Sequence, residues 1–101
     1  MRVGIIAPPW VPIPPTAYGG TEEFIDELAR GLQRAGHEVV LFCTGDSSCA
    51  VERQWVFDTS FPDSIGNADV ERRHVEHAYE ALRDADVVHD NTVAGPLYAR
   101  I

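Results

Sequence analysis

The sequence is constrained most by two continuous apolar runs, residues 3–7 and 39–43, which flank one amphipathic segment. Continuous apolar runs are typical of strands that are buried on both faces, as parallel strands are. Between the runs, apolar residues recur at helical spacing: Phe24, Ile25, Leu28, Ala29 and Leu32. The order strand, helix, strand predicts a right-handed βαβ unit, and therefore an α/β, Rossmann-like, three-layer fold with a mostly parallel sheet.

The predicted helix has signals at both ends. Thr21 stands where an N-cap is expected, and the acidic Glu22 and Glu23 follow it, at the end where the helix dipole favours negative charge. Gly36 is placed to end the helix in the left-handed conformation.

The pattern is weaker after the second apolar run. It predicts a short strand at 54–57, a second helix at 68–84, a strand at 86–89 and the start of another helix at 94–101. A chain of 101 residues is expected to form one domain.

Charge argues against two classes of partner. Eight arginines, with no lysine, stand against sixteen acidic residues, which gives a net charge of −8. Such a chain repels nucleic acid and anionic lipid. The lack of lysine also excludes a Walker-type phosphate lysine and a Schiff-base lysine within these residues. We find no apolar run of about 18 residues and no signal-peptide pattern, so we expect no membrane span and a cytoplasmic location.

The two cysteines and two of the four histidines invite a disulfide or metal interpretation. Cys43 reads as a buried strand residue and Cys49 as a loop thiol, and their spacing does not form a disulfide framework. His74 and His77 are three residues apart on a predicted helix and would face the same side, but no third ligand stands near them. We therefore expect no metal site.

The segment most suggestive of chemistry is the loop at 8–20. It carries five of the seven prolines and ends in Gly19-Gly20, just before the predicted helix at Thr21. Glycines let a ligand approach the backbone, and the free N–H groups of a helix N-terminus bind anions. The loop therefore predicts a phosphate or carboxylate site, although a glycine pair before a helix also serves as a purely structural turn. The GxGxxG motif of dinucleotide-binding folds is absent.

Two blocks of the sequence, residues 1–45 and 84–99, resemble the N-terminal domain of glycosyltransferases of family 4, which have the GT-B fold. The resemblance implies two Rossmann-like domains that face each other across a cleft. It also implies retaining, metal-independent transfer from a nucleotide-diphosphate sugar. In that family the N-terminal domain mainly binds the acceptor, and the nucleotide and the Glu-x7-Glu carboxylates belong to the C-terminal domain.

Carried over to this sequence, the resemblance places Gly19, Gly20 and Thr21 near the donor diphosphate, and Glu22 at the opening of the helix. It also matches His89, Asp90 and Asn91 to the end of a strand in the family's cleft, where relatives often show His-x-His or His-Asp-His. Trp10 and Tyr18 either line an acceptor pocket or anchor the loop. His89 is interpreted equally well as a substrate contact or as a buried structural histidine.

Asn91 departs from the family pattern, because relatives often have a histidine at this position. An amide forms hydrogen bonds but does not transfer protons.

We therefore expect residues 1–101 to be the acceptor-side portion of a glycosyltransferase of the hexosyltransferase type. We expect them to hold no catalytic residue and to be inactive alone, because the resemblance places the nucleotide-binding domain outside them. The expected partners are a nucleotide-diphosphate sugar and a sugar, lipid or small-molecule acceptor, with no cofactor. An uncovered sheet edge would favour a homodimer.

Two alternatives remain open. One is a fragment of a nucleotide- or dinucleotide-binding oxidoreductase, in which Asp46 reaches a ribose. The other is a non-catalytic α/β interaction module whose proline loop binds a protein.

Overall fold

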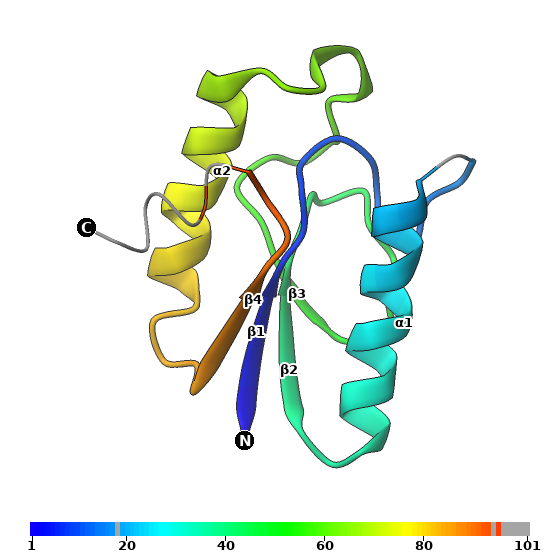
Figure 1. Cartoon of the computed structure of the whole chain (residues 1–101), viewed down its shortest axis with the longest axis vertical. Coiled ribbons are helices and arrows are strands. Elements are labelled where there is room, and N and C mark those ends of the chain that lie inside the picture. The colour runs from blue at the N-terminus through cyan, green and yellow to red at the C-terminus, as the bar shows by residue number, and fades with distance from the viewer. Residues whose placement is uncertain (18, 94, 96–101) are drawn as a thin grey trace.

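The computed structural model describes residues 1–17, 19–93 and 95, and within them four strands form one parallel sheet (Figure 1). The strands are β1 (Arg2–Ile6), β2 (Glu38–Phe42), β3 (Glu52–Gln54) and β4 (Val87–Asp90). Their order across the sheet is β3-β2-β1-β4, with β1 paired to both β2 and β4. The predicted α/β, Rossmann-like class is confirmed.

Two helices cover opposite faces of this sheet. Helix α1 (Gly20–Arg34) follows β1 and lies on one face, and α2 (Ala68–Ala81) lies on the other, so that the molecule has three layers (Figure 1). A short 3-10 helix at Pro62–Ser64 precedes α2. None of the helices in the described part of the chain is both long and apolar enough to span a bilayer.

The core has two parts because β1 and β2 are buried on both faces. Val3, Ile5 and Leu41 pack with Ile25 and Ala29 of α1. On the other face, Ile6, Val40 and Phe42 pack with Ala78 of α2 and with Leu82. This double burial explains why the two apolar runs in the sequence do not alternate with polar residues.

The observed boundaries differ most from the predicted ones at β3. The strand runs over Glu52–Gln54 instead of 54–57. The amide of Cys43 donates to the carbonyl of Gln54 at 3.0 Å, but the next contact, from the Gly45 amide, skips to the carbonyl of Phe57 at 2.9 Å. The chain therefore leaves the regular ladder of hydrogen bonds at Trp55, and the apolar residues 55–57 belong to a loop.

The buried face of α1 is also rotated from the predicted stripe. Phe24 is 52% exposed, whereas Glu22 and Asp26 are buried beside Ile25 and Ala29. Asp26 is accommodated by an ion pair with Arg30 at 3.0 Å. The helix ends as predicted, because Gly36 has a φ of 96° and the amide of the next residue bonds back to the last turn.

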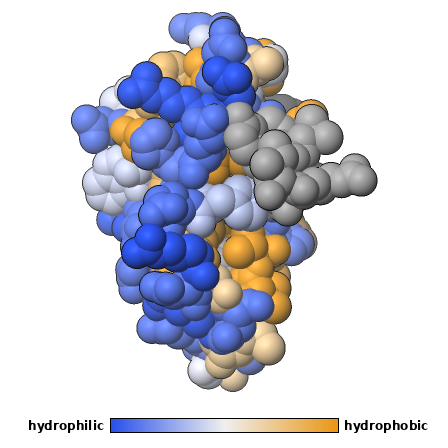
Figure 2. Space-filling view, turned by 90° about the vertical axis from the view of Figure 1, so that its left-hand side faces the viewer, coloured by the Kyte–Doolittle hydropathy of each residue, from blue (hydrophilic) through white to orange (hydrophobic). Residues whose placement is uncertain are grey.

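Strand β4 lies at an edge of the sheet and is less covered than the others. Its burial alternates between exposed and half-buried residues, and Val87 is 47% exposed. Figure 2 views the molecule from this side and shows an apolar patch beside the hydrophilic outer face of α2.

Candidate functional site

Parallel strands bring the ends of β1, β2 and β4 to one edge of the sheet, where ligands of open α/β folds bind. Helix α1 begins at this edge, after the chain has left β1 through the proline loop, residues 7–19 (Figure 1). The same edge therefore holds the start of α1 and the residues that follow β4.

The proline loop is fastened to the rest of the fold at its centre. Ile13 is fully buried, its amide donates to Ser47 Oγ at 2.9 Å, and its carbonyl accepts bonds from Ser48 and Cys49 at 2.8 Å each. The Pro9 carbonyl accepts a further bond from Phe61 at 2.9 Å. These contacts hold the loop in one conformation next to α1.

Helix α1 starts without a side-chain cap. Its N-cap is Gly19, and Thr21, which the sequence suggested for that role, lies exposed in the first turn. The first backbone bond of the helix runs from the Glu23 amide to the Gly19 carbonyl at 2.9 Å. The amides of Gly20, Thr21 and Glu22 precede it and have no acceptor within the helix.

The start of α1 forms one wall of a pocket of about 300 Å³, which we call the α1 pocket. It is lined by Trp10, Val11, Gly19, Gly20, Thr21, Glu22 and Ile65. Five of these are site residues expected from the sequence, and the structure brings them together. Val11 and Ile65 carried no sequence signal, because nothing in the pattern indicated that the loop before α2 would reach the proline loop.

The two glycines of the pocket differ in how much space their surroundings leave for a side chain. A Cβ at Gly19 would lie 3.0 Å from Glu22 Oε1 and 3.0 Å from Pro15 Cβ. A side chain at position 19 would therefore crowd both of these neighbours. A Cβ at Gly20 would meet nothing within 4 Å. Packing therefore does not require glycine at position 20, and a side chain there would occupy open space at the helix N-terminus.

A comparison with known protein families covers most of the chain. The model of Glycosyltransferase Family 4 matches residues 18–101, which include both helices, β2, β3 and β4 but not β1. The chain belongs to glycosyltransferase family 4. A comparison with curated protein sequences found no match.

In this family 4 chain, the three residues at the end of β4, Asp90 among them, have different contacts. Asp90 Oδ2 accepts the Tyr79 hydroxyl of α2 at 2.6 Å, and Asp90 Oδ1 accepts the Thr92 amide at 2.8 Å and the Thr92 hydroxyl at 2.7 Å. Burial, followed by the bond to Asp90, raises the pKa of Tyr79. Asp90 thus fastens β4 to α2.

His89 and Asn91 also lie outside the lining of the α1 pocket. His89 is exposed and pairs in register with Ile5, so it faces the α1 side of the sheet, opposite to Asp90. Asn91 donates from its amide side chain to the Ile6 carbonyl at 3.1 Å. The structure therefore places all three residues at the predicted edge but not in the pocket. Tyr18 and residues 94 and 96–101, where a further helix was expected, lie outside the described residues.

Asp46, the residue expected to reach a ribose in a dinucleotide-binding protein, has other partners. Its Oδ1 accepts the Thr44 hydroxyl at 2.5 Å, and its Oδ2 accepts the Ser60 amide at 3.0 Å and hydroxyl at 2.7 Å. Desolvation raises the pKa of this carboxyl, but the bonds from Thr44 and Ser60 outweigh it and lower the pKa. Asp46 thus joins two loops.

The histidine and cysteine pairs do not form the sites considered for them. His74 is fully buried and contacts the Ala7 carbonyl through Nε2 at 2.7 Å, whereas His77 is exposed. Cys43 and Cys49 are both buried and free, and Cys49 lies in a loop as expected. Burial raises the pKa of Cys43 to about 11 and that of Cys49 to about 12.

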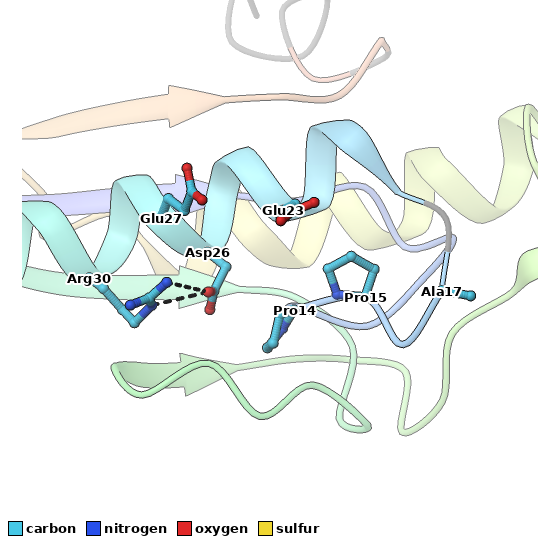
Figure 3. Close-up of a pocket in the computed structure, with 7 residues that line it drawn as sticks. All are labelled: Pro14, Pro15, Ala17, Glu23, Asp26, Glu27 and Arg30. Atoms are coloured by element: carbon cyan, nitrogen blue, oxygen red, sulfur yellow. Dashed lines mark hydrogen bonds and ion pairs between the residues drawn. The ribbon is translucent and has the colours of Figure 1, made fainter.

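Two other hollows lie near the proline loop. One, of about 250 Å³, is lined by Pro14, Pro15, Ala17, Glu23, Asp26, Glu27 and Arg30 (Figure 3). Arg30 in this hollow is paired with Asp26, so Glu23 and Glu27 make the hollow negatively charged and unsuited to phosphate. The other, of about 490 Å³, is lined mostly by apolar residues, among them Val11, Pro12 and Pro62.

Proposed function

We propose that this chain is the acceptor-side part of a retaining, metal-independent hexosyltransferase. It would help to move a sugar from a nucleotide-diphosphate sugar to an acceptor, with the donor diphosphate at the start of α1. The observation that carries this proposal is the uncapped N-terminus of α1 on the wall of the α1 pocket, with open space at Gly20. Family membership supports glycosyl transfer as the reaction class.

The amides of Gly20 and Thr21 would stabilise charge that develops on the departing diphosphate. Fixed N–H donors aimed at developing charge cost no reorganisation during the reaction. The helix dipole adds the equivalent of roughly half a positive charge at this end. The first turn also carries Glu22 and Glu23, which oppose that field.

The charge balance indicates what else the reaction needs. Half a positive charge does not neutralise a diphosphate, and no arginine lines the α1 pocket within the described residues. We infer that cationic groups other than the described lining residues complete the donor site, together with the catalytic carboxylates. The chain alone then supplies one wall of a site and transfers sugar only at background rate.

A binding panel tests the proposal against its alternatives. The chain is titrated by calorimetry with UDP-, GDP- and ADP-linked hexoses and with NAD. We expect at least one nucleotide sugar to bind at least about tenfold more tightly than NAD, a difference of about 1.4 kcal/mol. Tighter binding of NAD would favour the oxidoreductase, and binding of neither class would favour the interaction module. Either result would contradict the proposal.

A further inference from the structure

We propose that His74 is a positioning residue for the α1 pocket, because its buried ring holds together the two loop segments that carry Trp10 and Ile65 on the pocket wall. Without this ring the pocket would lose the relative placement of the two side chains. The inference rests on the proposed function only where it names the ligand, a nucleotide-diphosphate sugar. The contacts that carry it lie within the chain.

The first segment is the start of the proline loop. His74 is fully buried on α2, and its Nε2–H donates to the carbonyl of Ala7 at 2.7 Å. Pro8 and Pro9 come next and have no amide hydrogen, so no backbone N–H can fasten the chain between Ala7 and Trp10. The path on which the chain leaves β1 is therefore held through carbonyl groups, and the first of these is bound by His74.

The second segment, residues 57–65, lies between β3 and α2 at the edge of the sheet where α1 begins (Figure 1). The ring of His74 lies parallel to that of Phe57, with 7° between the planes and 6.4 Å between the centroids. Phe57 in turn packs edge-on against Phe61 at 4.8 Å. The Phe61 amide donates to the Pro9 carbonyl at 2.9 Å. His74 therefore contacts both segments, and the segments bond to each other beside it.

The second nitrogen of the ring indicates why this residue is a histidine. His74 Nδ1 is buried and has no hydrogen-bond partner among the described residues. Nε2 needs its hydrogen for the Ala7 carbonyl, so Nδ1 is a bare acceptor in the neutral ring. A buried acceptor without a partner costs free energy, and a leucine would avoid that cost. A leucine could not donate to Ala7, however, so the ring serves the bond to the loop and not packing alone.

His74 holds the two segments as a neutral group. Burial lowers its pKa to about 4, so the ring is uncharged at pH 7. Asp90 on β4 favours the charged ring, and His77 on α2 opposes it. β2 and the second segment present the phenyl rings of Phe42 and Phe57. The contacts of the ring are therefore constant near pH 7, and substitutions at this pH test them.

Backbone hydrogen exchange of the full chain, without ligand, measures how firmly the segments are held. His74→Leu removes the donor, so the Phe61 amide should exchange at least about tenfold faster relative to the Leu41 amide of β2. His74→Gln keeps an N–H donor and should stay within about threefold of the original chain. A loss of protection confined to Phe61 distinguishes placement of the loops from a general loss of stability.

Ala78→Gly is the matched control. Ala78 is fully buried on the same helix, but it packs against Ile6 and Val40 of the sheet. Glycine weakens a helix at any interior position. This variant should therefore accelerate the exchange of Phe61 and Leu41 by the same factor.

A further variant applies if His74→Leu fails to fold. Phe57→Leu removes the ring that links His74 to Phe61 and leaves the bond to Ala7 in place. It should show the same selective acceleration at Phe61, and a uniform acceleration would contradict the proposal.

Binding of UDP-, GDP- and ADP-linked hexoses at pH 7 then connects the loops to the ligand. A nucleotide sugar that binds the original chain should bind His74→Leu at least about tenfold more weakly and His74→Gln within about threefold. Both variants are compared by calorimetry with Ala78→Gly, which should bind the nucleotide sugar as the original chain does.

Three results would overturn the proposal. These are uniform acceleration of exchange in a folded His74→Leu variant, equal acceleration at Phe61 in His74→Leu and His74→Gln, and unchanged affinity of His74→Leu for a nucleotide sugar. If no nucleotide sugar binds the original chain, the proposed function fails, and the exchange rates alone decide the role of His74. If a nucleotide sugar binds the original chain and His74→Leu equally well, this inference alone fails.

Discussion

Replacing Gly20 with valine should weaken binding of the nucleotide-diphosphate sugar at least about tenfold while the chain stays folded. A Cβ at this position meets no atom within 4 Å, so the fold tolerates the side chain. The same open space is where the diphosphate would approach the amides of α1. Calorimetry with the nucleotide sugar measures the loss, and circular dichroism checks the fold.

Gly31→Val is the matched control for this substitution. Gly31 lies in the same helix, its Cβ would make only ordinary contact with Arg34 at 3.8 Å, and it does not line the α1 pocket. The Gly31→Val variant should bind the nucleotide sugar with the same affinity as the original chain. Equal affinities of a folded Gly20→Val variant and the original chain would remove Gly20 from the donor site.

Lowering the pH from 6.5 to 4 should destabilise the fold by about 3 kcal/mol through His74 alone. Burial lowers the pKa of His74 to about 4, and the hydrogen bond to the Ala7 carbonyl only partly offsets that effect. The ring also lies between Phe42, at 4.9 Å between centroids, and Phe57, at 6.4 Å. In the unfolded chain the pKa is about 6.5. The unfolded state therefore binds more protons between these values, and stability falls as the pH falls through this window.

Urea denaturation at pH 7, 5.5 and 4.5 measures this dependence. His74→Gln keeps an N–H donor for the Ala7 carbonyl but does not titrate, so its stability should vary much less over this range. His77→Gln, which removes an exposed histidine of the same helix, should keep the original dependence. An unchanged pH dependence in His74→Gln would show that other groups cause the acid lability.

The parts of the fold that the sequence predicted best are those where burial dictates the residue type. β1 and β2 were predicted within one residue, because burial on both faces forces a continuous apolar run. β3 has the sequence Glu-Arg-Gln and is held by backbone bonds at an edge, so no apolar pattern marks it. The apolar residues that suggested a strand there, Trp55 to Phe57, lie after the strand.

The candidate site was predictable only in its local part. Gly19 and Gly20 were found because glycines before a helix imply a known backbone chemistry. Val11, Ile65 and the burial of Glu22 were not found, because they depend on how the proline loop is fastened through Ile13 to residues 47–49, more than thirty positions along the chain. Contacts of this kind between loops leave no periodic pattern in the sequence.

We expect a nucleotide-diphosphate sugar to contact the N-terminus of α1. This expectation is tested most directly by following every backbone amide of the ¹⁵N-labelled chain while UDP-, GDP- and ADP-linked hexoses are added. We expect one of these nucleotide sugars to shift the amides of Gly20 and Thr21 more than any other amides. Shifts centred instead on Gly45 and Asp46, at the end of β2, or no shift in the α1 pocket with any of the three, would contradict it.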